Sequence, residues 1–225
     1  MLAAIVAGGL GTRMGAVTAN MPKPMLPVRG KPLLEHQLIW LKNQGFSEVV
    51  LCVGYKAEVV KDYFGDGGKW GLKLGYSIED KPRGTAGCIA DLKTKDDVLV
   101  VYGDLFPDLE LAPLLEFQAE HRDGEATLVL LRTDHPQDSD LAELDGARIK
   151  RIYRGGPGDL ALAAVWIVKP SLTDLIPADQ ASDFGRDVFP AALARGRRLL
   201  GCVMKGVLAD LGTPERLARF EAARA

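Results

Sequence analysis

Short apolar runs alternate with segments of helical periodicity along the first part of the chain. Runs of this length and composition are typical of buried strands, and the segments between them repeat apolar residues on one helical face. The predicted strands cover residues 2–6, 48–53, 74–78 and 98–102, and the predicted helices cover residues 33–44, 57–64 and 85–92. Gly45 follows the first helix where a C′ glycine belongs. The alternation predicts βαβ units and a mostly parallel sheet covered on both faces.

The pattern changes after Asp104, where strands become more frequent than helices. Strands are predicted over residues 126–132, 147–153, 161–168, 199–204 and 207–211, a polar stretch over 133–145, and helices over 113–121, over 182–194 and from residue 214. This order predicts a mixed region that forms the wall of a pocket rather than a separate domain. We therefore expect one α/β domain over residues 1–225, with a Rossmann-like, mostly parallel but mixed sheet flanked by helices.

Composition limits the classes of partner. The chain has 225 residues, 47% of them hydrophobic, which is enough for one sizeable core. The net charge of −2 gives no reason to expect nucleic acid or an anionic membrane as a partner. The three cysteines are far apart and lie outside any CxxC spacing, so neither a disulfide framework nor a zinc site is predicted. These features, with no cationic leader and no membrane-length apolar run, favour a soluble cytoplasmic protein.

A glycine-rich segment follows the first predicted strand. Gly8, Gly9 and Gly11 leave room for backbone N–H groups to turn toward a ligand at the carboxyl end of that strand. Arg13 and Lys23, the latter between two prolines, supply two cations close by. Loop and cations together suit a polyphosphate, with the arginine fork clamping terminal oxygens. The alternative is a glycine-rich turn with two solvated cations.

The glycines also form a loose variant of the dinucleotide-binding fingerprint. That motif requires a helix that opens directly on the glycines, and four prolines are expected to keep this chain extended until about Leu33. The acidic residue expected about 20 residues later is missing as well. The dinucleotide interpretation is therefore disfavoured.

Several segments resemble one family, the sugar-phosphate nucleotidyltransferases, and in particular the short bacterial heptose- and mannose-1-phosphate guanylyltransferases. The matching segments, in the family's order, are GGLGTRM with PKPMLPV, YSIEDKPRGTAG (residues 76–87), VYGDLF (101–106), DVFP (187–190) and LADLGTPE (208–215). They are spread over almost the whole chain. The resemblance implies a glycosyltransferase-A-like fold, with a nucleotide-binding half over residues 1–110 and a sugar-phosphate-binding half over 111–225.

The resemblance also implies a reaction. An oxygen of a sugar 1-phosphate attacks the α-phosphorus of a nucleoside triphosphate, which gives a nucleotide sugar and pyrophosphate. Because the attacking phosphate is already anionic, the protein has to position charges rather than activate a nucleophile. The implied nucleotide-binding residues are Ala7, Gly8, Gly9, Gly11, Thr12, Arg13, Lys23, Glu79, Gly84 and Thr85.

Two aspartates are candidate ligands of Mg²⁺. Asp104 follows a predicted buried strand through Gly103, which places it at the carboxyl edge of the sheet beside the glycine loop. In the resembling family, the residue that corresponds to Asp210 meets this aspartate at one metal ion. Two carboxylates plus phosphate oxygens and waters suit Mg²⁺. We therefore expect Arg13, Lys23, Asp104 and Asp210 to form the catalytic set.

In the resembling family the residue five positions before the glycine of the PxGT motif reads the base, so the resemblance implies this role for Glu79. An ionised carboxylate can only accept hydrogen bonds, and guanine offers two adjacent donors whereas uracil offers one. GTP is therefore the favoured donor, although some uridylyltransferases of the family also carry glutamate at this position. A solvated glutamate at the end of a strand is the alternative.

The sugar half departs from the family pattern. Asp140 aligns near an expected glycine, Arg154 and Gly155 near an expected Glu-Lys pair, and Leu162 near an expected asparagine. Arg154 and Arg186 are the candidate cations for the sugar phosphate. Asp104 is a further candidate residue at the sugar-phosphate site. These departures are consistent with an unusual acceptor, or with a subunit that binds a nucleotide sugar without turnover.

The leading interpretation is guanylyl transfer to a heptose or mannose 1-phosphate. The oligomeric state stays open, with a homo-oligomer as one alternative. Uridylyl transfer to another sugar 1-phosphate stays open. Molybdenum-cofactor guanylyltransferases and the cytidylyltransferase of isoprenoid synthesis also carry a glycine loop ending in RMG. Their lysine follows the arginine more closely than Lys23 follows Arg13, so the spacing disfavours them.

Overall fold

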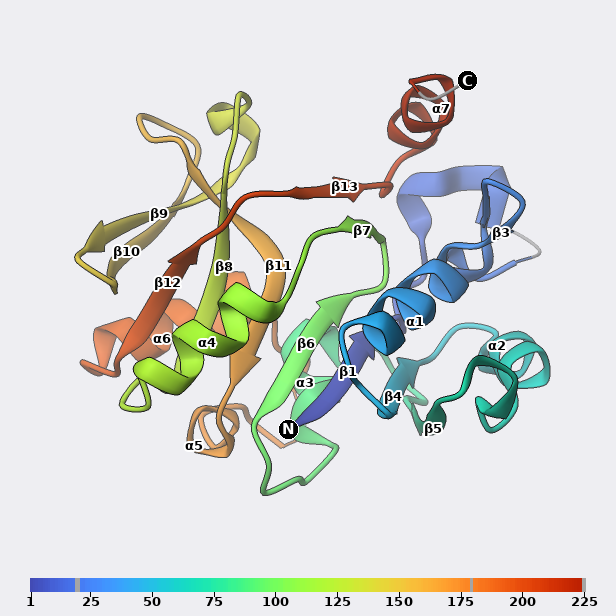
Figure 1. Cartoon of the computed structure of the whole chain (residues 1–225), viewed down its shortest axis with the longest axis horizontal. Helices are drawn as coiled ribbons and strands as arrows, with labels where there is room; N and C mark the ends of the chain where they lie inside the picture. Colours follow the sequence, from blue (N-terminus) through green and yellow to red (C-terminus); the bar gives the residue numbers. More distant parts are fainter. Residues whose placement is uncertain (19–20, 179, 224–225) are drawn as a thin grey trace. The chain divides into compact units, whose positions relative to one another are not determined.

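In the computed structural model the chain forms two compact units (Figure 1). It describes residues 1–18, 21–178 and 180–223, except for the side chains of residues 13, 16 and 17. The N-terminal unit comprises Leu2–Pro82, Val101–Asp108 and Leu208–Ala225. The central unit comprises Arg83–Val100 and Leu109–Val207, together with Met1. No helix in the described ranges is both long and apolar enough to cross a membrane.

The N-terminal unit contains a parallel sheet. Its strands are β1 (Leu2–Val6), β4 (Glu48–Val53) and β5 (Lys73–Ile78), in the order β5-β4-β1, and the end of β6 (Val98–Tyr102) lies next to β1. The apolar strand β1 is buried along its middle, as expected for a strand covered on both faces. The bounds of β4 agree with the prediction, and α2 (Ala57–Phe64) contacts β5.

Helix α1 (Leu33–Asn43) begins where the prediction placed it and ends in a Schellman motif. Gly45 donates its N–H to Lys42 O at 3.1 Å, and Phe46 donates to Leu41 O at 3.1 Å. Gly45 has φ of 89°. The predicted role of this glycine at C′ is confirmed.

The segment between β1 and α1 is not extended, so that expectation was wrong. It contains two 3₁₀ helices, η1 (Thr12–Thr18) and η2 (Lys23–Met25), and a short hairpin of β2 (Pro27–Val28) and β3 (Lys31–Pro32). Proline is compatible with the first turn of a helix because that N–H has no intrahelical partner. No α-helix opens on the glycines, which agrees with the rejection of the dinucleotide-binding fingerprint.

The chain ends within the N-terminal unit. Strand β13 (Val207–Asp210) pairs with β7 (Leu105–Asp108), a strand missing from the prediction, and α7 (Pro214–Ala222) follows. A small core holds this region together. Its members are buried Val28, Leu33 and Leu211, with Phe106, Ala209, Leu217 and Phe220 packed against them.

The central unit contains a mixed sheet, with strand order β11-β8-β12-β10-β9 and the start of β6 next to β11. β8 pairs antiparallel with β11 and parallel with β12. Helix α4 contacts β8, and α6 contacts β10 and β12. The elements are α3 (Gly84–Ala90), α4 (Ala112–Glu120), β8 (Ala126–Arg132), β9 (Asp140–Asp145), β10 (Arg148–Arg154), β11 (Leu160–Val168), α5 (Pro170–Thr173), α6 (Phe189–Ala194) and β12 (Leu199–Val203).

Two predictions in the central unit were wrong in part. The polar stretch over residues 133–145 ends in strand β9, which the pattern conceals because only Leu141 and Ala142 of this strand are buried. The helix over residues 182–194 is a π-helical segment, η5 (Phe184–Val188), followed by α6. Pro190 has no N–H for a regular helical bond, which agrees with the wider turn immediately before it.

The predicted fold class is confirmed: the chain is α/β, with parallel strands in one unit, mixed strands in the other, and helices on the sheet faces. The proposed functional division at residue 110 stays a prediction.

Candidate active site

The candidate residues are distributed over both units. Those in the N-terminal unit are Ala7, Gly8, Gly9, Gly11, Thr12, Arg13, Lys23, Glu79, Asp104 and Asp210. Those in the central unit are Gly84, Thr85, Arg154 and Arg186. The prediction for Arg13 concerns a side chain that lies outside the described residues, although its backbone belongs to η1.

The glycine loop leaves the sheet at the end of β1. Ala7 still continues the sheet, since its N–H donates to Cys52 O at 2.8 Å. In the described ranges, no backbone carbonyl accepts from the N–H groups of Gly8, Gly9 and Leu10. Gly8 is buried, whereas Gly9 and Leu10 are exposed, so the backbone at these two positions can be reached by an anionic ligand.

Glu79 lies directly against this loop. A Cβ added to Gly8 would be 1.8 Å from Glu79 Oε1, and one added to Gly54 would be 3.1 Å from Glu79 Cγ. The Glu79 N–H donates to Val53 O at 2.9 Å, which fixes its backbone at the end of the β4–β5 pair. The close approach requires glycine at position 8, and it brings the predicted base-reading carboxylate to the predicted phosphate loop.

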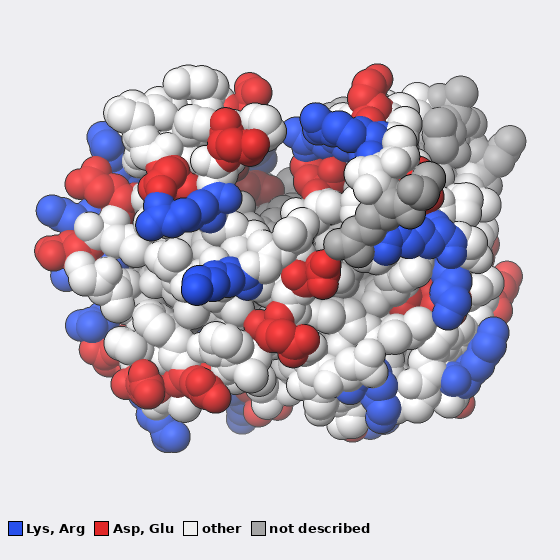
Figure 2. Space-filling view, turned by 45° about the horizontal axis from the view of Figure 1, so that its top comes forward, with Lys and Arg blue, Asp and Glu red and all other residues white. Residues whose placement is uncertain are grey.

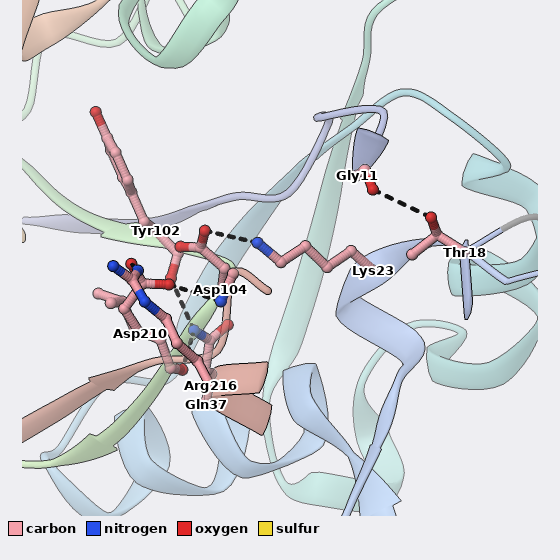
Figure 3. Close-up of polar contacts among 10 residues, drawn as sticks. Gly11, Thr18, Lys23, Gln37, Tyr102, Asp104, Asp210 and Arg216 are labelled. Carbon is pink, nitrogen blue, oxygen red and sulfur yellow. Dashed lines mark hydrogen bonds and ion pairs between the residues drawn. The ribbon is translucent and has the colours of Figure 1, made fainter. Parts of the chain in front are cut away.

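Lys23 reaches Asp104 across the N-terminal unit. Its Nζ lies 2.7 Å from Asp104 Oδ2, and the two side chains are only 11% and 23% exposed (Figure 3). A Cβ on Gly11 would lie 3.4 Å from Lys23 Cβ, so the base of the lysine runs beside the loop. Thr18 supports the loop by donating its hydroxyl to Gly11 O at 3.1 Å (Figure 3).

Asp210 lies beside Asp104, as Figure 3 shows. The Leu211 N–H donates to Asp104 O at 2.9 Å, which ties the end of β13 to the turn before β7. Asp210 Oδ1 accepts from the Gly212 N–H at 2.6 Å, and Oδ2 pairs with the Arg216 guanidinium. The structure therefore joins the backbone segments that carry the two predicted metal ligands, although these residues are far apart in the chain.

The donor set suits a hard cation. The described side chains contain no group of three or more His, Cys, Asp and Glu residues placed to hold a metal ion. A cation bound by Asp104 and Asp210 would therefore take its other ligands from phosphate oxygens and water, as Mg²⁺ commonly does. Lys23 and Arg216 balance the charge of the two carboxylates.

Sequence analysis missed Arg216 and Gln37 beside these aspartates. Arg216 follows immediately after the LADLGTPE segment, and Thr213 caps its helix by accepting from the Arg216 N–H at 3.3 Å. Its place directly after this family segment was the sequence signal that could have identified Arg216. Gln37 lies within an apolar helical face, and no local pattern distinguishes it.

Gly84 and Thr85 open helix α3 in the central unit, where they contact the segment before η5. The Ala86 N–H donates to Ser182 O at 2.8 Å, and a Cβ on Gly84 would lie 2.4 Å from the same oxygen. The Thr85 hydroxyl donates to Asp183 Oδ2 at 2.7 Å. Thr85 therefore has a structural partner in this unit.

The two candidate sugar-phosphate cations of the central unit are exposed and paired with acids. Arg154 lies opposite Asp140 in the β9–β10 pair, with Nη1 3.1 Å from Oδ1. Arg186 pairs with Asp187, whose carboxylate raises the pKa of the guanidinium. The pKa of Asp187 is lowered by the Asp183 N–H first and by Arg186 second.

Leu162 stands near the expected position of the family's asparagine, on β11 opposite Leu130. The register of the β11–β8 pair shifts between Leu162 and Trp166, and Ala164 within this interval has φ of 52°. A non-glycine residue in the left-handed region is uncommon, so this bulge is a specific feature of the strand.

The cysteines take no part in the candidate site. Cys52, Cys88 and Cys202 form no disulfide in the described part of the chain, and all three are buried. Burial raises the pKa of Cys202 to about 11, so this thiol is protonated near neutral pH.

Acidic and basic side chains are interspersed over the face drawn in Figure 2. The cation–carboxylate pairs formed by Lys23, Arg154, Arg186 and Asp210 repeat this balance locally. Any attraction for an anionic ligand therefore has to come from local geometry rather than from a broad charged surface.

Two relatives found by comparison with known proteins are both named as guanylyltransferases of a sugar 1-phosphate. A mannose-1-phosphate guanylyltransferase of Mycobacterium tuberculosis is 35% identical over 228 residues, covering 98% of this chain and 63% of that protein. A D-glycero-alpha-D-manno-heptose 1-phosphate guanylyltransferase of Campylobacter jejuni is 47% identical over 116 residues, covering 51% of this chain and 52% of that protein. The chain thus spans less than two thirds of the length of these relatives.

Solved structures share the fold. HddC from Yersinia pseudotuberculosis superposes with a TM-score of 0.82 at 24% identity, covering 100% of this chain and 99% of that one. The nucleotidyl transferase family model matches residues 2–224. By this match over nearly its whole length, the chain belongs to the nucleotidyl transferase family.

Proposed function

We propose that this chain transfers a guanylyl group from GTP to a heptose or mannose 1-phosphate, with Mg²⁺ as cofactor. An oxygen of the sugar phosphate forms a bond to the α-phosphorus of GTP while the bond from that phosphorus to the bridging oxygen breaks. The products are a nucleotide sugar and pyrophosphate. The relatives named above, which include guanylyltransferases for both kinds of sugar phosphate, support this assignment.

One observation carries the proposal: Lys23 runs beside the glycine loop and pairs with Asp104, whose turn is tied to the segment directly after Asp210. The loop would bind phosphate oxygens through Gly8, Gly9 and Leu10. Lys23 would add a point charge next to the same oxygens. Asp104 and Asp210 would hold Mg²⁺, which supplies charge neutralisation at the phosphates when bound.

Base selection is assigned to Glu79. Its carboxylate lies against Gly8, so a base beside the loop would meet two acceptor oxygens. Guanine N1–H and the N2 amino group donate in the pattern that a carboxylate accepts, whereas uracil O4 would face negative charge. A relative from Synechocystis that is named a UTP–glucose-1-phosphate uridylyltransferase, 28% identical, makes uridine the main competing base.

The test is pyrophosphate release, measured for each nucleoside triphosphate against a panel of sugar 1-phosphates with and without Mg²⁺. We expect turnover with GTP and a heptose or mannose 1-phosphate, only in the presence of the metal ion. Turnover confined to UTP would contradict the base assignment, and turnover in the presence of EDTA would contradict the metal assignment.

A second candidate function is binding of a nucleotide sugar without catalysis. The observation in its favour is the ion pair between Arg154 and Asp140. In this pair the guanidinium that is expected to bind the sugar phosphate is already bound to a carboxylate. GTP binding by calorimetry, combined with no turnover for any acceptor in the panel, would favour this candidate over the enzyme.

A further inference from the structure

A buried glutamine lies against the turn that carries Asp104. Gln37, in α1, is fully buried within the N-terminal unit. Its amide nitrogen donates to two backbone carbonyls, Tyr102 O at 2.8 Å and Leu105 O at 2.7 Å (Figure 3). These carbonyls stand on either side of Gly103 and Asp104, so one amide group bridges the two ends of the turn.

The same turn is held at two further points. The Gly103 N–H donates to Val6 O at 2.8 Å, and a Cβ on Gly103 would be 2.9 Å from that oxygen, so the turn fits tightly against the end of β1. The Leu211 N–H donates to Asp104 O at 2.9 Å. With these contacts in place, the backbone of Asp104 is held by α1, β1 and the segment after β13, and Lys23 holds its carboxylate.

The chemistry of the glutamine amide fits this role. A glutamine carries two N–H donors on one nitrogen, which allows it to satisfy two carbonyls that converge from one side. Gln37 Oε1 is buried and has no hydrogen-bond partner among the described residues. A buried acceptor without a partner is unfavourable, so the favourable contribution of this polar side chain comes from its two donors.

We propose that Gln37 is a positioning residue for Asp104: by bridging Tyr102 O and Leu105 O it holds the carboxylate where it binds the divalent cation with GTP. The inference rests on the proposed function, because it assumes that Asp104 is a metal ligand. Residues that orient a ligand commonly change metal affinity by about 10-fold to 100-fold when they are replaced.

The variant Gln37→Met keeps the length and volume of the side chain and removes both donors. We expect the Kd for Mn²⁺, measured by electron paramagnetic resonance with GTP present and no sugar phosphate, to rise by about 10-fold. In turnover assays the required Mg²⁺ concentration should rise as well, while KM for the sugar 1-phosphate stays unchanged. Gln37→Asn retains an amide that cannot span both carbonyls, and it should give a smaller rise in the same Kd.

The chain offers a matched control. Gln118, in α4, is also a buried glutamine, and its amide contacts the side chains of Thr127 and Asp97 in the central unit. Gln118→Met should lower the melting temperature without moving the Mn²⁺ Kd by more than about twofold, because its hydrogen bonds go to Thr127 and Asp97 rather than to the Asp104 turn, and sites without shared partners act independently. Loss of stability alone would therefore not reproduce the expected result.

Asp104→Asn separates the two ways in which the idea can fail. If Asp104→Asn weakens Mn²⁺ binding and both Gln37 variants bind Mn²⁺ as the wild type does, the positioning role is overturned and the metal site stands. If Asp104→Asn also leaves the Kd unchanged, both the metal assignment and the inference are overturned. If the Gln37 variants and Gln118→Met weaken binding equally, the effect is general destabilisation and the positioning role is again overturned.

Discussion

The two units hold their candidate residues in different ways. In the N-terminal unit, Lys23 and Asp104 form a pair across 81 residues of chain, and both side chains are largely shielded from solvent. In the central unit, Arg154 and Arg186 are 65% and 77% exposed and pair with acids that are close in sequence or on the adjacent strand. Long-range pairing at a shielded point indicates a built site, whereas exposed pairs are common on any surface.

This difference corresponds to where the family motifs are strong. The glycine loop and the Asp104 and Asp210 segments match the family, and their residues converge in the N-terminal unit. The segments that depart from the family, around Asp140 and Leu162, belong to the central unit. If the proposed function is right, this comparison predicts that the phosphate and metal site follows the family pattern and that acceptor selection is the part that varies.

The largest expected effect tests the N-terminal unit. Asp104→Asn removes the proposed metal ligand and the charge that faces Lys23, and we expect turnover to fall by about 10³-fold, the upper range for loss of a charge-stabilising group. Pyrophosphate release under saturating substrates is the measurement. Asp108→Asn, an exposed residue of β7, is the control and should retain activity. Wild-type turnover in Asp104→Asn would remove this residue from the active site.

Gly8→Ala tests whether Glu79 is held by the loop. The new Cβ would stand 1.8 Å from Glu79 Oε1, so the carboxylate has to move. We expect the preference in kcat/KM for GTP over UTP to fall by about 10-fold, the scale of one lost hydrogen bond, and Glu79→Gln to act in the same direction.

Gly9→Ala is the control for this loop. A Cβ there meets nothing within 4 Å, so the GTP preference should stay at its wild-type value. If Gly8→Ala and Gly9→Ala leave the same base preference, Glu79 does not read the base.

Arg154→Ala tests the central unit. If this cation binds the sugar phosphate, KM for the sugar 1-phosphate should rise by about fivefold, as expected for a contact of an exposed charge, with KM for GTP unchanged. Asp140→Ala frees the same guanidinium and should leave that KM unchanged or lower it. If both variants have the same KM for the sugar 1-phosphate, the Arg154–Asp140 pair serves only to stabilise the pairing of β9 with β10.

The smallest expected effect concerns stability rather than activity. Burial raises the pKa of Glu35, but hydrogen bonds from Tyr63, Lys31 and Trp70 outweigh it, so the net pKa lies below 4.5. The stabilisation by ionised Glu35 is therefore present above pH 4.5 and is lost as the pH falls through the lowered pKa. Tyr63→Phe removes one of these bonds and should cost about 0.5–1 kcal/mol in free energy of unfolding at neutral pH.

Urea denaturation of Tyr63→Phe at neutral and acidic pH gives the measurement, and the cost should shrink once Glu35 is protonated. Tyr76→Phe is the control, since its hydroxyl donates to the neutral Gly65 O at 2.6 Å. The cost of that substitution should stay the same over the acidic range. A Tyr63→Phe cost that does not change with pH would show that Glu35 stays in one protonation state over this range.

The pattern of apolar and polar residues predicted most helices and strands, because residues that are close in sequence determine where these elements form and end. The bounds of β4, α2 and β6 agree with the apolar runs, and Gly45 ends α1 where a C′ glycine was expected. The failures have specific causes. β9 buries too few residues to show an alternating pattern, and η5 widens before Pro190 because that residue cannot donate a helical bond.

The candidate site divides in the same way. The sequence by itself determined the residue types that suit a triphosphate and a hard cation: a glycine loop after a buried strand, and the separate residues Lys23, Asp104 and Asp210. Only the tertiary structure decided that Lys23 pairs with Asp104 and that the segment after Asp210 is tied to the Asp104 turn. It also decided that Glu79 lies against Gly8, that Gln37 bridges the Asp104 turn, and that Arg216 pairs with Asp210. Strand order and the pairing of β13 with β7 bring together residues that are far apart in the chain. Periodicity reports only which face of an element is buried, so it carries no information about such contacts.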